Sequence, residues 1–81
     1  MLRRAVVSRS MTSTTKAAAA NIRAELGRQD MSRAALARQL GVTEMWLSRR
    51  INAHTPITVD ELAMIAAALD VTPVALLGEA S

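Results

Sequence analysis

The chain has 81 residues, which is enough for one domain with a single small core. Hydrophobic residues make up 51% of it, but Phe, Tyr and Cys are absent. This excludes disulfides, thiolate nucleophiles and cysteine-based zinc sites, and with a single Trp it almost excludes aromatic platforms for stacking nucleic-acid bases. The net charge is +3, and every Lys and Arg lies within residues 1–57, whereas the charged residues of 58–81 are all acidic. Such a polarised charge distribution favours a negatively charged partner such as nucleic acid.

Residues 1–15 are rich in Ser, Thr and Arg and predict a basic N-terminal arm before a domain at 16–81. Residues 2–8 have some strand character, so the arm is expected either to be flexible or to pair as an edge strand with a second molecule. A transit peptide has a similar composition, but a complete small domain follows it here. The residues expected to serve as a dimer strand or a contacting arm are Leu2, Arg3, Arg4, Val6, Val7 and Arg9.

The remainder predicts five helices with short connections and no strand, which is an all-α fold. The first helix is expected to begin at Thr14 or Thr15, to include the alanine run 17–20, and to end near Gly27. Apolar residues at spacings of three and four give each helix one buried face. The expected N-cap residues of the four later helices are Ser32, Thr43, Thr58 and Thr72.

The most informative stretch is 32–52, SRAALARQLGVTEMWLSRRIN. Its two short helices are separated by Gly41, Val42 and Thr43, and a three-residue turn with glycine is typical of a helix-turn-helix. Leu47 and Ile51 are expected to hold the second helix against the core. The residues then left facing outward are Glu44, Met45, Ser48 and Arg49.

This stretch resembles the helix-turn-helix of the Cro and CI repressors of phages and of the wider XRE-like family. Residues 55–78 extend the resemblance, because they carry the pattern "L..IA.AL.V....LL" of the family's fourth and fifth helices. The resemblance covers about 16–78 and implies a five-helix, lambda-repressor-like DNA-binding domain. Two positions depart from the pattern: Ala53 stands where the family often has glycine, and Arg50 stands where an apolar residue is common.

The resemblance implies that residues 43–52 form a recognition helix that enters the major groove of double-stranded DNA. Glu44 would accept from cytosine, Met45 would touch a thymine methyl group, and Ser48 would reach a base. Arg49 would donate to both acceptors of a guanine. Glu44 could instead stabilise its helix, and Met45 could be a packing residue. The expected phosphate contacts are Ser32, Arg33, Thr43, Arg50, Asn52, His54 and Thr55.

These features predict a Cro-like transcriptional repressor that occupies operator DNA as a homodimer, in the bacterial cytoplasm at the nucleoid. The chain ends soon after the fifth helix, which favours a Cro-like protein over a CI repressor with a second domain. No phosphate-binding loop, nucleophile–base pair or metal cluster is evident, so we expect no enzyme activity, metal, cofactor, small-molecule ligand or membrane contact. The alternatives are an antitoxin-like autoregulator with a protein partner and a helical interaction module without DNA binding.

Overall fold

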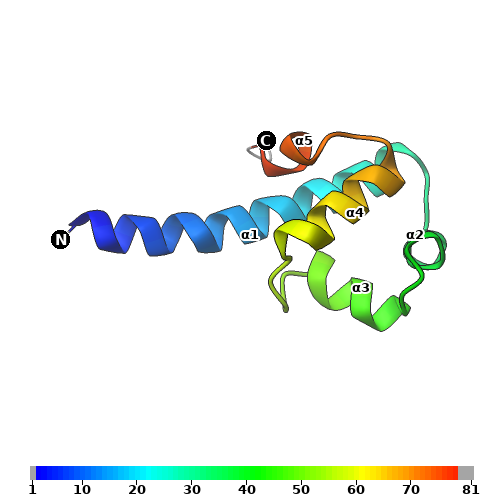
Figure 1. Cartoon of the computed structure of the whole chain (residues 1–81), viewed down its shortest axis with the longest axis horizontal. Helices are drawn as coiled ribbons and strands as arrows, with labels where there is room; N and C mark the ends of the chain where they lie inside the picture. Colours follow the sequence, from blue (N-terminus) through cyan, green and yellow to red (C-terminus); the bar gives the residue numbers. More distant parts are fainter. Residues whose placement is uncertain (1, 79–81) are drawn as a thin grey trace.

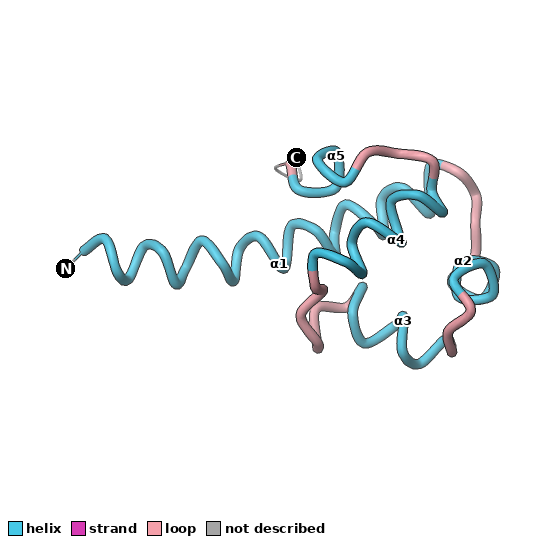
Figure 2. Tube along the Cα trace, in the orientation of Figure 1, coloured by secondary structure: helices cyan, strands magenta, loops and turns pink. Residues whose placement is uncertain are grey.

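The structure, a computed structural model, describes residues 2–78 of the chain. It contains five helices, α1 (Leu2–Arg28), α2 (Arg33–Leu40), α3 (Glu44–Ile51), α4 (Val59–Leu69) and α5 (Pro73–Leu77) (Figure 1). No strand occurs within residues 2–78, which confirms the all-α prediction (Figure 2). In the same part of the chain, no helix combines the length and the apolar character needed to cross a membrane.

Helix α1 begins much earlier than the sequence pattern predicted. It runs unbroken from Leu2 to Arg28, so the backbone of residues 2–13 is helical and is neither an extended arm nor a strand. Neither proline nor glycine occurs before Gly27, and the alanine run favours helix strongly, so nothing stops the helix from extending through Thr14 and Thr15. The N-terminal half of α1 projects away from the other four helices (Figure 1).

The four later helices begin where their capping residues predicted. The side-chain oxygens of Ser32, Thr43, Thr58 and Thr72 each accept a hydrogen bond from the backbone N–H three residues on, at 3.0 to 3.2 Å. Gly41 ends α2 with a φ of 73°, as expected for the turn of a helix-turn-helix. These contacts are local in sequence, which is why the residue types alone located the helix starts.

The core lies between the C-terminal half of α1 and the three helices α2, α3 and α4. Its largest fully buried side chains are Ile22, Leu36, Leu47, Ile51, Ile65 and Leu69. Asn21 of α1 and Gln29, which follows α1 directly, hold the C-terminal part of the chain through hydrogen bonds. Asn21 Nδ2 donates to the carbonyls of Leu76 at 2.8 Å and Gly78 at 2.7 Å, and Gln29 Nε2 donates to that of Leu69 at 2.7 Å. The buried side chains Leu47 and Ile51 hold the inner face of α3 against this core.

The loop after α3 contains a residue in the left-handed backbone conformation, although that residue, Ala53, is not a glycine. Ala53 has a φ of 62°, a conformation that costs a residue with a side chain roughly 1–2 kcal/mol. Ala53→Gly should relieve this strain, although glycine also raises the entropy of the unfolded chain. We expect a net gain of about 0.5–1 kcal/mol in the free energy of unfolding. Chemical denaturation measures it, and an unchanged or lower midpoint would contradict the strain.

Candidate nucleic-acid interface

The turn between α2 and α3 presents one face of α3 to solvent. The backbone N–H of Val42 donates to the carbonyl of Ala37 at 3.0 Å, and Val42 itself packs against the core. Leu47 and Ile51 are fully buried on the inner side of α3. The opposite side carries Glu44, Met45 and Arg49, all exposed, and Met45 keeps 72% of its surface accessible. The outward orientation predicted for these three residues is therefore what the structure shows.

Arg33 connects the start of α2 to the outer face of α3. Its Nη1 donates to Ser48 Oγ at 3.4 Å and its Nη2 donates to Asn52 Oδ1 at 3.2 Å. Ser48 is consequently half-buried, whereas Asn52 is exposed at the end of the helix. The guanidinium thus adds positive charge to the second half of α3 instead of remaining over the first turn of its own helix.

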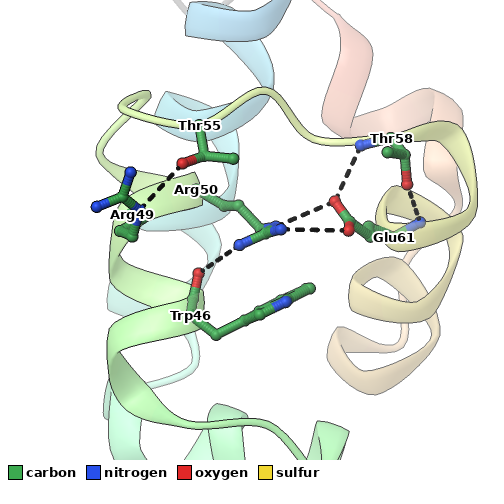
Figure 3. Close-up of polar contacts among 6 residues, drawn as sticks. All are labelled: Trp46, Arg49, Arg50, Thr55, Thr58 and Glu61. Carbon is green, nitrogen blue, oxygen red and sulfur yellow. Dashed lines mark hydrogen bonds and ion pairs between the residues drawn. The ribbon is translucent and has the colours of Figure 1, made fainter.

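Arg49 lies beside the loop that follows α3. Its Nε donates to Thr55 Oγ1 at 3.2 Å (Figure 3). Its backbone carbonyl accepts from the N–H groups of His54 and Thr55. Neither Nη group of Arg49 donates to any residue in the described part of the chain. The side chain is held near its base while its two outer donors remain directed away from Thr55, which suits a bidentate contact with an external acceptor.

Arg50 does not face outward, in contrast to the prediction that it contacts phosphate. Its Nε donates to Glu61 Oε1 at 3.1 Å and its Nη1 to the carbonyl of Trp46 at 3.0 Å (Figure 3). The guanidinium carbon also lies 3.8 Å from the centre of the Trp46 ring. Only 15% of the Arg50 side chain is exposed. Arg50, which stands where the family often has an apolar residue, therefore packs between α3 and α4 and joins them through polar contacts.

Glu61 interacts both with the N-cap of α4 and with Arg50. Its Oε1 accepts from the backbone N–H of Thr58 at 3.0 Å and completes a capping box at the start of α4, while both carboxylate oxygens face Arg50. The Thr58 N–H and the Arg50 guanidinium together hold the pKa of Glu61 below its usual value. The charged form of Glu61 is therefore favoured in the folded protein.

This shift predicts a loss of stability in acid. Because the folded pKa of Glu61 is lowered, its contribution is complete above the unfolded value of about 4.3 and disappears as the pH falls through the folded pKa. We expect the free energy of unfolding to fall between about pH 5 and pH 3 less steeply in Glu61→Gln than in the natural chain. Urea denaturation at each pH measures it, and equal slopes would contradict the coupling.

A further residue that none of the sequence patterns above includes, Arg23, positions α3. Arg23 of α1 donates through Nη1 to the carbonyl of Ile51, the last residue of α3. The carbonyls at a helix C-terminus carry partial negative charge, so a guanidinium is favourable there. No local pattern could have indicated this contact, because the two residues are far apart in the sequence and meet only through the packing of α1 on α3.

The other predicted phosphate contacts lie around the ends of α2 and α3. Ser32, Thr43 and His54 are exposed, and Thr55 is half-buried against Arg49. The hydroxyls of Ser32 and Thr43 already accept from their own helices, as N-caps do. The N–H groups of Arg33 and Ala34 make no hydrogen bond within the described residues, so the start of α2 retains donors for an anion.

Comparison with known proteins identifies a helix-turn-helix over the same part of the chain. A family model described as helix-turn-helix matches residues 22–76, which is more than half of the chain. No curated protein and no solved structure matches the chain. The matched range extends from within α1 into α5 and so includes every helix that packs around the motif. The chain therefore belongs to the helix-turn-helix family of the Cro/CI (XRE-like) type, which is a family of DNA-binding regulators.

Proposed function

We propose that this protein is a sequence-specific regulator of transcription, a Cro-like repressor that places α3 in the major groove of operator DNA. The observation that carries the proposal is the outer face of α3. Three of its residues, Glu44, Met45 and Arg49, are exposed while its inner face is fixed by buried side chains. A rigid helix with exposed side chains near its N-terminus is the geometry that direct base recognition requires.

Each outward residue suits one kind of base contact. The two outer donors of Arg49 fit the paired acceptors of guanine, and the Glu44 carboxylate can accept from the amino group of cytosine. Met45 offers an apolar surface for a thymine methyl group. Ser48 is the least accessible of the four, because Arg33 donates to it, so its base contact requires Arg33 to remain in place or to move with the DNA.

Phosphate contacts then come from both ends of the motif. At the start of α2 they comprise Ser32 and the unpaired N–H groups beside it, and in the turn they include Thr43. Beyond α3 they comprise Asn52, His54 and Thr55. Arg33 serves both parts, since its guanidinium bridges α2 and α3. Arg50 is not among them, because Glu61 and Trp46 hold it inside.

Repression would result from occupation of the operator by the protein. A single motif covers only about half of an operator, so two copies would bind a symmetric site, about one helical turn apart, and exclude polymerase from it. Such a repressor works in the bacterial cytoplasm, where the chromosome lies. The charge pattern supports this arrangement, since the basic residues lie in 1–57, which include α2 and α3.

Selection of the full chain on random duplex DNA at about 150 mM salt tests the proposal, because phosphate attraction alone is weak there. We expect an enriched motif of two inverted half-sites. Enrichment of a single half-site would support recognition by a monomer and contradict the symmetric operator. Weak binding that is lost as salt increases, with no enriched motif, would overturn sequence-specific regulation.

A further inference from the structure

Arg33, the first residue of α2, contacts two side chains on the outer side of α3. Glu44, Ser48 and Asn52 follow one another at intervals of four residues, so they form one row along that helix. Arg33 is half-buried beside the row, where its Nη1 donates to Ser48 Oγ at 3.4 Å and its Nη2 to Asn52 Oδ1 at 3.2 Å. Two of the three polar side chains in the row are therefore already bound to one guanidinium.

The chemistry of arginine decides which atoms of these side chains remain for a ligand. A guanidinium donates hydrogen bonds but cannot accept one. The oxygen of the Asn52 amide consequently faces Arg33, and its Nδ2 group is turned away from it. At Ser48 the contact uses a lone pair of the hydroxyl oxygen and leaves the O–H free to donate. Within residues 2–78 neither the Ser48 hydroxyl nor Asn52 Nδ2 donates to an acceptor, so both donors are available.

The charge of Arg33 strengthens this polarity. No carboxylate pairs with Arg33 in the described part of the chain, in contrast to Arg50, whose charge is offset by Glu61. A hydroxyl that accepts from a cation becomes a stronger donor, and the same positive charge repels the amino hydrogens of a base that approaches Ser48. The row therefore changes from an acceptor at its start to donors along the rest of its length.

We infer that Arg33 determines base specificity indirectly, by making Ser48 a donor to a base and Asn52 a donor to a phosphate. Because this concerns the DNA contact of α3, it rests on the proposed function. In the major groove guanine, adenine and thymine each present an acceptor, whereas cytosine presents only its amino group. Ser48 should therefore disfavour cytosine at the base that it faces, and Arg33 is the positioning residue for that preference.

Binding to the operator obtained by selection, and to operators changed to each other base at single positions, tests the role of Arg33. We expect Ser48→Ala to lose the discrimination against cytosine at one position by about fivefold, the value of one neutral hydrogen bond. Arg33→Met, which keeps an apolar stem, should lose it at the same position, and the double variant should lose no more there than Ser48→Ala alone. The matched control Arg38→Met should leave that preference unchanged, because Arg38 is an exposed arginine of α2 that donates to no described residue.

A separate variant tests the orientation of Asn52. In Asn52→Asp one carboxylate oxygen would pair with Arg33, so the protein should unfold at the natural temperature or above it. The other oxygen would face phosphate in place of Nδ2. We expect affinity to fall about tenfold or more for every sequence, and the loss to shrink at higher salt because the repulsion is screened. Unchanged affinity would show that Asn52 does not donate to phosphate, and would overturn that half of the inference.

The results for Arg33 separate this role from a simple phosphate contact. If Arg33→Met weakens binding equally at every position, with a salt dependence shallower by about one ion, Arg33 is only a phosphate contact and the inference fails while the proposed function stands. A preference of the natural chain for cytosine at the position that Ser48→Ala relaxes would also overturn it. If the natural chain enriches no motif, the proposed function fails and the inference with it.

Discussion

Replacing Arg49 by alanine should remove the preference for one base pair in each half-site while the protein still folds. Arg49 is exposed, and Thr55 accepts from its Nε, so its loss leaves no buried group without a partner. A bidentate contact with guanine is worth about 1–3 kcal/mol of discrimination. We therefore expect a tenfold to hundredfold loss at one position of the enriched motif, on the order of that energy.

The measurement compares the affinities of the variant for the selected operator and for operators changed at single positions. Arg28→Ala is the control, because Arg28 is also an exposed arginine but pairs with Glu25 at the end of α1, outside the motif. Uniform weakening by Arg49→Ala at every position, with a salt dependence shallower by about one ion, would show a phosphate contact instead.

Arg50→Ala should have the opposite profile, with a clear loss of stability and an unchanged salt dependence of DNA binding. It removes the half-buried ion pair with Glu61, the hydrogen bond to the Trp46 carbonyl and the contact with the Trp46 ring. Together these are worth about 2 kcal/mol, which corresponds to a fall in Tm of about 10 °C for a domain of this size.

Thermal unfolding and the salt dependence of binding should be measured on the same variant. The Arg28–Glu25 pair supplies the matched control, because Arg28 is 69% exposed and Arg28→Ala should cost only a few tenths of a kcal/mol, roughly the value of a surface pair. If Arg50→Ala unfolds at the natural temperature but loses salt dependence, Arg50 leaves Glu61 on binding DNA and contacts phosphate.

The sequence by itself was sufficient for features that depend on neighbouring residues. Ser32, Thr43 and Thr58 located the helix starts because a cap and the N–H that it accepts lie within one turn. Gly41 marked the turn because few other residues adopt its φ at low cost. The apolar spacing of Leu47 and Ile51 gave the inner face of α3, and the motif then gave the family.

Only the tertiary structure decided what the arginines do. Arg49 and Arg50 are adjacent and chemically identical, but Arg50 meets Glu61 and Trp46 across the packed helices, whereas Arg49 points toward the loop and solvent. Arg23 and Arg33 likewise find their acceptors on α3 only after the helices pack. The extent of α1 was missed for a different reason: helix propagation is cooperative, so the continuity of the alanine run outweighed the weak strand and capping preferences of residues 2–15.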